Sequence, residues 1–298
     1  MAKLSSTCAA TSERRDRASG ALSVCAIIVS YRTGASLAAC LDALARADGL
    51  DEIVLIDNGN EPAEVQALDA FVINVPRARL ERGQGNIGFA AACNLGARAA
   101  QSDVLVFVNP DAILAREAIP RLSAALQAAP PPAIVGGDLR DAHGASERGS
   151  RRDTLTLWRA FVAFTGLSVL GPLFPIFRDF NRHHDPLPAA PVRVGAVSGA
   201  LMMMRRADFE VLGGFDEGYF VHVEDLDICR RAELAGWPVL FAPGPHGMHV
   251  RSTSAADPRE LSRHKRRGMA RYLKKFARAP IERTLANLAA AILTRGAQ

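Results

Sequence analysis

Residues 24–30 read VCAIIVS and residues 53–59 read IVLIDNG, and these two stretches decide the fold class. A continuous apolar run of this length is typical of a strand that is buried on both faces of a parallel sheet. A segment with helical spacing of apolar residues, 34–45, follows the first run, and the first half of the chain alternates as a parallel α/β sheet does. The expected strands are 24–30, 53–56, 71–75, 104–108, 133–135, 194–204 and 239–241, and the expected helices are 34–45, 87–100, 116–129, 224–235 and 258–277.

The composition of the 298-residue chain is that of a globular protein. Hydrophobic residues make up 49% and charged residues 22%, which excludes a disordered or fibrous protein. The five cysteines show no paired spacing and are expected to be reduced thiols in a reducing compartment. We divide the chain into a flexible polar leader (1–22), a main domain (23–257) with an apolar and proline-rich insertion (138–192), and a basic helical extension (258–298).

The basic charge is concentrated near the C-terminus. The formal net charge is +5, yet residues 259–283 alone contain ten Lys or Arg and only two Asp or Glu. The helix expected there could meet an anionic membrane surface. A solvated basic face and a nucleic-acid patch are the alternatives, and we expect no nucleic-acid partner.

An uncharged segment of 18 residues, AFVAFTGLSVLGPLFPIF, spans 160–177. Its length meets the lower limit for a membrane span, but glycines and prolines interrupt its second half. We therefore expect a helix that ends near Leu170 and is either buried or lies on a membrane surface. A membrane span is the alternative.

Glycine-rich residues 83–88 read GQGNIG, which matches the spacing GxGxxG. As a dinucleotide-binding motif the match is weak, because it lies well after the first strand of the fold. A glycine-rich turn whose backbone approaches a ligand at a helix N-terminus is the preferred interpretation.

Polar residues follow three of the expected strands. Tyr31 and Arg32 follow the first strand, Asp57 and Asn58 the second, and residues 109–111 (NPD) the fourth. Ligands of open parallel sheets bind beyond the carboxyl ends of the strands, so these groups should meet at one edge. A carboxylate there can bind ribose hydroxyls, or a divalent cation that bridges two phosphates. Turn formation and helix capping are the alternative roles.

A second acidic cluster lies at residues 214–227, where GFDE precedes VEDLD. Glu224 and Asp225 follow the apolar stretch 220–223, so they are expected to emerge from the interior, where a carboxylate can act as a general base. Asp227 is expected to be solvated or to cap the helix, and stabilisation of a helix N-terminus is the simpler alternative for all three acids. The lone His249 is expected to be structural unless it pairs with His246 as a metal ligand.

Taken together, these strings resemble the family-2 glycosyltransferases of the GT-A fold, within which they are similar to the bacterial rhamnosyltransferase-type branch. The matching strings are AIIVSYR (26–32), IVLIDNG (53–59), GNIGFAAACN (85–94), VFVNPDA (106–112), VSGALMMMRRADFEVLGGFDEGYFVHVEDLDICRRAELAGW (197–237) and PGPHGMHVRSTS (243–254). The resemblance implies a Rossmann-like nucleotide-binding half with a mostly parallel sheet, an acceptor-side half and C-terminal helices.

The resemblance also implies roles for particular residues. The residues expected to hold a nucleotide-sugar donor are Ser30, Tyr31, Arg32, Asp57, Asn58, Asn86, Gly88, Asn109 and Asp111. Asp111 would bind Mg²⁺ or Mn²⁺, with His249 as a second ligand or a diphosphate contact. Asp225 would be the catalytic base, supported by Glu224. Arg32 and Asn109 depart from the commoner residues of the family, and Asn109 leaves one carboxylate fewer for the metal.

The implied activity is an inverting, metal-dependent glycosyl transfer in cell-surface polysaccharide assembly. The sugar, L-rhamnose or a related one, would pass from a dTDP- or UDP-linked donor to a saccharide or polyprenyl-linked acceptor. The location would be cytoplasmic, with peripheral attachment to the inner face of the cytoplasmic membrane. A catalytically silent protein that binds sugar nucleotides or acts as a membrane scaffold is the main alternative, and an NAD(P)-dependent oxidoreductase is a third.

Overall fold

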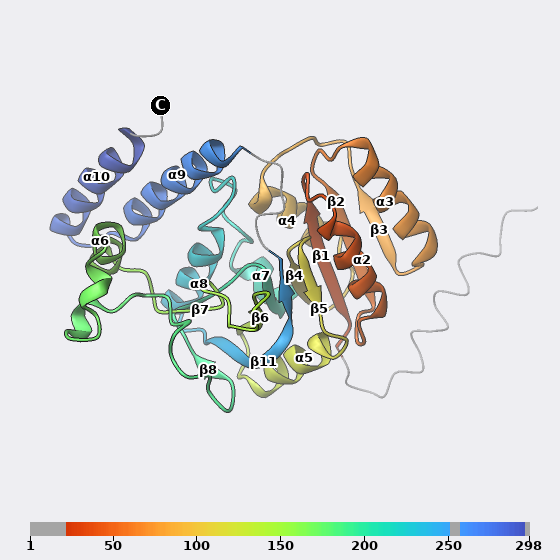
Figure 1. Cartoon of the computed structure of the whole chain (residues 1–298), viewed down its shortest axis with the longest axis horizontal. Helices are drawn as coiled ribbons and strands as arrows, with labels where there is room; N and C mark the ends of the chain where they lie inside the picture. Colours follow the sequence, from red (N-terminus) through yellow and green to blue (C-terminus); the bar gives the residue numbers. More distant parts are fainter. Residues whose placement is uncertain (1–21, 251–256, 296–298) are drawn as a thin grey trace, which may run out of the picture.

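A computed structural model describes residues 22–250 and 257–295, so the expected leader lies almost entirely outside the described residues. Its centre is one nine-stranded sheet with helices on both faces (Figure 1). In spatial order the strands are β3 (Ala78–Glu81), β2 (Glu52–Asp57), β1 (Val24–Ser30), β4 (Val104–Val108), β10 (Leu201–Arg205), β6 (Ile134–Arg140), β11 (Val239–His249) and β5 (Ala112–Leu114), and β8 (Val192–Arg193) pairs with β11. A separate two-stranded sheet joins β7 (Arg151–Arg152) to β9 (Ala196–Val197).

The N-terminal half of the sheet is parallel, as the apolar runs predict. Strand β1 lies between β2 and β4, and every residue of β1 is buried. Alternate β1 side chains face two different cores, so Cys25 and Ile27 contribute to one and Ala26 and Ile28 to the other. The result is a three-layer α/β fold.

The helices divide between these two cores. They are α2 (Ser36–Arg46), α3 (Pro62–Asn74), α4 (Phe89–Ala99), α5 (Ala118–Ala128), α6 (Leu157–Thr165), α7 (Arg206–Val211), α8 (Glu224–Leu234), α9 (Pro258–Phe276) and α10 (Pro280–Arg295). Buried residues of α2, α3 and α5 pack against one face of the sheet. Buried residues of α4, α6, α8, α9 and α10 belong to the core on the other face.

The expected third strand, 71–75, is wrong. Phe71 lies in α3, where it is buried together with Leu68 three positions earlier. The true third strand is β3, whose residues ARLE are all only half-buried because it is the edge of the sheet. A short apolar run cannot distinguish a helix from a strand, and an edge strand has a weak apolar signal.

The expected strand 194–204 is also wrong in its extent. It is divided into β9 and β10 by residues 198–200, and β10 runs antiparallel to both β4 and β6. Strands β6 and β11 continue well beyond the expected 133–135 and 239–241. The interruption at 198–200 matters because it places a loop at the edge where the ends of β1, β2 and β4 meet.

The apolar segment of the insertion forms α6 and two short 3₁₀ helices, η2 (Leu167–Leu170) and η3 (Pro175–Phe177). Among the described residues, no helix is both long and apolar enough to cross a membrane. The segment is not buried either, since Phe161, Phe164 and Leu173 are exposed. The four cysteines in the described part of the chain are buried free thiols, in agreement with the sequence. The domain boundaries stay a prediction.

Candidate active site

The polar residues that follow β1, β2 and β4 lie at one edge of the sheet, as expected. Ser30 is paired in register with Asp57, and Asn109 follows the end of β4 directly. Parallel alignment of the three strands brings their carboxyl ends together. The edge therefore has the position at which open α/β sheets bind ligands.

Asn60, which the sequence did not single out, ties the ends of β1 and β2 together. Its Nδ2 donates to Asp57 Oδ1 over 2.9 Å and to the Ser30 carbonyl oxygen over 3.1 Å. The Ser30 hydroxyl donates back to Asn60 Oδ1, and Asp57 Oδ1 also accepts from the backbone N–H of Gly59 and Asn60. Ser30 and one oxygen of Asp57 therefore shape the turn.

Asn58 and Asn86 hold the glycine-rich loop against the end of β2. Asn58 Nδ2 donates to Asn86 Oδ1 over 3.0 Å, and the Ile87 N–H donates to Asn58 Oδ1. Asn86 Oδ1 also accepts from the Gly88 N–H. Both side chains therefore bond to other protein groups and fix the loop beside the expected donor site.

The Gly88 backbone makes its close approach to another part of the chain. The N–H of Phe89 donates to the Phe220 carbonyl oxygen over 2.6 Å, and a Cβ on Gly88 would lie only 2.6 Å from the same oxygen. Gly88 also has a φ of +85°, which favours glycine. In this structure the close backbone approach that we expected toward a ligand is made to Phe220.

Arg32 and Tyr31 lie side by side after β1. The Arg32 guanidinium is 5.5 Å from the centre of the Tyr31 ring and pairs with Glu61 over 3.1 Å. Arg32 has a φ of +47°, an uncommon conformation for a residue with a side chain. The positive charge expected near the donor is therefore partly balanced by Glu61.

His249 lies between two carboxylates. Its Nε2 is 2.8 Å from Asp111 Oδ1, and its Nδ1 is 2.9 Å from Glu147 Oε2. Burial acts to lower the pKa of His249, but hydrogen bonding to Asp111 and Glu147 raises it to about 9. Glu147 belongs to the insertion, and no sequence motif pointed to it.

Asp111 and His249 thus lie side by side, as the expected metal ligands would. His246 instead contacts the backbone of Asp138 and Gly244. Over residues 22–250 and 257–295, no three His, Cys, Asp or Glu side chains are arranged to hold a metal ion. Of the residues expected to bind a metal, Asp111 supplies one carboxylate and His249 one imidazole.

Asp225 is half-buried at the start of α8 and bonded on both oxygens. Oδ2 accepts from Arg152 Nη2 over 2.7 Å and from the Gly199 N–H over 3.2 Å, and Oδ1 accepts from the Leu226 N–H. Burial acts to raise the pKa of Asp225, but the Arg152 charge and these hydrogen bonds bring it below its usual range. Asp225 is therefore held ionised, as a general base must be.

Glu224 has the opposite environment. It is buried, and in the described part of the chain its Oε2 has no hydrogen-bond partner. Burial and the neighbouring Asp225 charge raise the pKa of Glu224 to about 8. The two adjacent carboxyl groups are thus held in different protonation states at neutral pH.

The loop at residues 198–200 brings the two halves of the predicted site together. Gly199 donates its N–H to Asp225, and the next residue, Ala200, accepts from the N–H of Asn109 over 3.1 Å. A Cβ on Gly199 would lie 3.4 Å from Asp225 Cβ and 3.9 Å from the Phe89 ring. Residues expected to bind the donor and the expected base therefore surround one loop.

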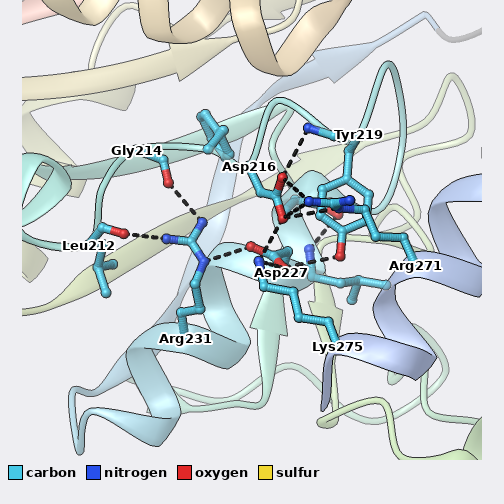
Figure 2. Close-up of polar contacts among 12 residues, drawn as sticks. Leu212, Gly214, Asp216, Tyr219, Asp227, Arg231, Arg271 and Lys275 are labelled. Atoms are coloured by element: carbon cyan, nitrogen blue, oxygen red, sulfur yellow. Dashed lines mark hydrogen bonds and ion pairs between the residues drawn. The ribbon is translucent and has the colours of Figure 1, made fainter. Parts of the chain in front are cut away.

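Asp227 is neither solvated nor a simple cap, which corrects the expectation from the sequence. Its side chain is fully buried, with Arg231 Nε at 2.6 Å, Lys275 Nζ at 2.6 Å and the Tyr219 hydroxyl at 3.1 Å. Figure 2 shows this network, in which Arg231 also donates to the carbonyl oxygens of Leu212 and Gly214. The network joins α8 to α9 across 48 positions of sequence, from Asp227 to Lys275.

The fold is that of the GT-A glycosyltransferases. The structure is similar to Staphylococcus aureus TarS (TM-score 0.55, 13% identity, covering 92% of this chain and 71% of that one). It is also similar to the mannosyltransferase PcManGT of Pyrobaculum calidifontis, whose structure contains GDP-Man and Mn²⁺ (TM-score 0.56, 17% identity, covering 97% and 78%).

Residues 25–212 match the family model for glycosyl transferase family 2, and the chain belongs to this family. An N-acetylglucosaminyl-diphospho-decaprenol L-rhamnosyltransferase of Mycobacterium tuberculosis is 30% identical over 246 residues, which are 78% of each protein. The rhamnosyltransferase WbbL of Escherichia coli is 42% identical over 86 residues, which are 26% of this chain and 33% of that protein. The resemblance deduced from the motifs is confirmed, and the chain is a glycosyltransferase.

Proposed function

We propose that this glycosyltransferase moves L-rhamnose or a related sugar from a dTDP- or UDP-linked donor to a polyprenyl-linked saccharide, in cell-surface polysaccharide assembly. The observation that carries the proposal is the meeting of Asn109 and Asp225 on the loop 198–200. The names of the two rhamnosyltransferase relatives support the choice of sugar, and that of the mycobacterial relative supports a lipid-linked acceptor.

The donor would lie at the edge formed by β1, β2 and β4. Tyr31 and Asp57 would contact the nucleoside, since Asp57 Oδ2 is not among the atoms that shape the turn at Asn60. Asn58 and Asn86 would act indirectly by fixing the glycine-rich loop and Gly88. Asn109 and Asp111 would face the diphosphate.

Asp111 and His249 fit a metal ion that arrives with the nucleotide. Mg²⁺ is commonly bound through one or two carboxylates together with substrate phosphates, and Asp111 supplies one such carboxylate beside His249. When bound, such a cation would neutralise charge on the departing diphosphate. In the structure Asp111 and His249 bond to each other, so that contact would open on binding, and His249 would release a proton because only a neutral imidazole binds a metal.

Asp225 would take the proton from the acceptor hydroxyl. The new bond would join the acceptor oxygen to the anomeric carbon as the bond from that carbon to the diphosphate breaks. Attack from the face opposite the leaving group inverts the anomeric configuration. A positioned base of this kind contributes about 10²–10⁴-fold to the rate.

Transfer with purified protein tests this function. We expect rhamnosyl transfer from dTDP- or UDP-rhamnose to a polyprenyl-diphosphate-linked N-acetylglucosamine, with inverted anomeric configuration in the product by NMR. Donor binding in a thermal-shift assay without transfer to any saccharide or lipid-linked acceptor would favour the catalytically silent alternative. A Mn²⁺ series in the same assay tests the metal dependence.

The proposed acceptor places the reaction at the inner face of the cytoplasmic membrane. A donor made in the cytoplasm and an acceptor anchored by a polyprenyl chain meet only at that surface. Peripheral attachment of this chain is therefore part of the proposal.

A further inference from the structure

Three helices of the described chain gather at one end of the molecule, away from the parallel half of the sheet. Figure 1 shows α6, α9 and α10 at this end, on the opposite side from α3 and β3. Helix α10 packs against α9 through small residues, of which Ala286 and Ala290 are buried. Helix α6 also contacts α10.

The outward face of α10 is made of large apolar residues. Ile281, Leu285, Leu288 and Ile292 are spaced four, three and four positions apart, so they form one stripe. Their side chains are 51–70% exposed. An ordinary surface helix buries its large apolar side chains, whereas α10 buries alanines and exposes four large apolar side chains.

The segment from α6 to η3 adds aromatic and aliphatic side chains at the same end. Trp158, Phe161, Phe164 and Ile176 are exposed. The Trp158 Nε1–H donates to the Ile176 carbonyl oxygen, which holds α6 and η3 together. Tryptophan is enriched at membrane–water interfaces, where an apolar ring and a polar N–H are both satisfied.

A basic groove lies beside the stripe, between α9 and α10. It has a volume of about 590 Å³ and is lined by Arg267, Ala270, Arg271, Lys274, Lys275 and Thr294. Arg271 and Lys275 are paired with Asp216. Arg267 and Lys274 have no carboxylate partner within the residues that the structure describes, so their charge is available.

We infer that this end of the molecule, comprising α6, η3, α10 and the α9–α10 groove, is a docking face for an anionic lipid bilayer. The apolar stripe and the aromatic side chains would enter the interface, and Arg267 and Lys274 would bind lipid phosphates. The inference rests on the proposed function in one respect: a lipid-linked acceptor would explain why the enzyme binds a membrane. Its physical basis is the combination of exposed apolar groups and positive charge.

Charge favours a bilayer over a second copy of the chain as the occupant. Residues 258–295 contain eleven Lys or Arg against two Asp or Glu. A symmetric dimer would place this patch against itself and bring like charges together, which opposes association. Anionic headgroups supply the complementary charge.

The docking face is connected to the active site through α9. The ring of His264 stacks on Phe220 with 4.3 Å between centres, and a Cβ on Gly268 would lie 3.3 Å from the His222 carbonyl oxygen. Both contacts are to the segment that leads into Asp225. A bilayer bound at this end would therefore lie at a fixed position relative to the reacting groups.

Vesicle flotation tests the inference without donor or acceptor. We expect the full chain to float with phosphatidylcholine–phosphatidylglycerol vesicles and not with phosphatidylcholine alone. Leu285→Ser/Leu288→Ser and Arg267→Glu/Lys274→Glu should each weaken binding by about tenfold or more, from lost apolar insertion and lost headgroup attraction respectively. High salt should weaken binding of the wild type.

Matched controls alter exposed residues elsewhere. Ile73→Ser/Val211→Ser removes two exposed apolar side chains from α3 and α7, and Arg46→Glu reverses an exposed charge on α2. Both controls should bind vesicles like the wild type. Equal loss in the controls, absence of wild-type binding, or binding without regard to lipid charge would overturn the inference.

Sedimentation velocity without lipid tests whether a second copy of the chain, instead of a bilayer, covers this face. A dimer that dissociates in Leu285→Ser/Leu288→Ser would identify the face as an interface between copies and would also overturn the inference. Vesicle binding needs no sugar nucleotide, so the two hypotheses can be told apart. Loss of vesicle binding with intact transfer to a water-soluble acceptor would contradict only the docking face. Vesicle binding without any transfer would contradict only the proposed function.

Discussion

Two carboxylates that lie two positions apart on α8 have contrasting surroundings. Asp225 faces the loop 198–200 and pairs with the cationic Arg152 of the short strand β7. Asp227 points the other way, into the interior, and contacts Arg231, Lys275 and Tyr219. Residues two apart on a helix do not share a face, so one helix turn can serve the reaction on one side and hold α9 on the other.

The largest effect is expected from Asp225→Asn. Loss of the proposed base should lower kcat for sugar transfer by about 10²–10⁴-fold while donor binding is retained. The melting temperature should also fall, because the buried Arg152 loses its counter-charge. Steady-state transfer kinetics and a thermal shift with the donor measure these quantities. Near-normal transfer would show that another group takes the proton.

Asp227→Asn should have the opposite outcome. It removes the buried carboxylate that pairs with Arg231 and leaves Lys275 paired with Asp216 alone, and it should lower the free energy of unfolding by about 3 kcal/mol. Transfer per folded molecule should be retained, because Asp227 does not face the loop 198–200. Urea unfolding measures the stability, and the milder Tyr219→Phe, which removes one hydrogen bond to Asp227, should lower it by about 1 kcal/mol. A large loss of kcat with unchanged stability would remove the contrast between the two carboxylates.

Arg152→Gln should sharpen the assignment of Asp225. Without the guanidinium the pKa of Asp225 rises, so the acid limb of the pH profile of kcat/KM should move to higher pH by about one to three units. Arg151→Gln is the matched control, because Arg151 contacts backbone carbonyl oxygens of residues 182, 185 and 186 and not Asp225. A uniform loss of rate at all pH values would mean that Arg152 only supports the fold.

Glu224→Gln tests stability alone, and its effect on the free energy of unfolding should depend on pH. The pKa of Glu224 is raised to about 8 in the folded protein, so folding retains a proton that the unfolded chain releases above its own pKa near 4. The wild type should therefore match the variant near pH 4 and become progressively less stable than it up to about pH 8. Melting temperatures measured across this range test the sign, and a difference that does not depend on pH would contradict a protonated Glu224.

The sequence was sufficient for the parallel half of the fold and for placing several of the expected site residues at one edge of the sheet. Continuous apolar runs at 24–30 and 104–108 identify central strands because both faces of those strands are covered. The strand-end residues could be assigned to one edge because parallel alignment leaves no other arrangement. The motifs around Asp111 and Asp225 completed the family assignment.

The remaining features depend on contacts between distant residues. Arg152 and Glu147 lie in the insertion and reach Asp225 and His249 across 73 and 102 positions, so nothing nearby in the chain indicates their partners. The sequence around Asp227 is typical of an exposed acidic residue in the first turn of a helix. In the fold, α9 packs nearby and its Lys275 contacts Asp227. The edge strand β3 has a weak apolar pattern because one of its sides is unpaired.

The contact between Gly88 and Phe220 has a consequence for engineering this enzyme. Because Gly88 has no side chain, the loop that would bind the nucleotide can approach the loop that precedes Asp225 this closely. A transplanted loop that carries a side chain at position 88 would meet Phe220 unless residues 219–223 were exchanged with it. Chimeras of this family are therefore best built by swapping the two loops as a matched pair.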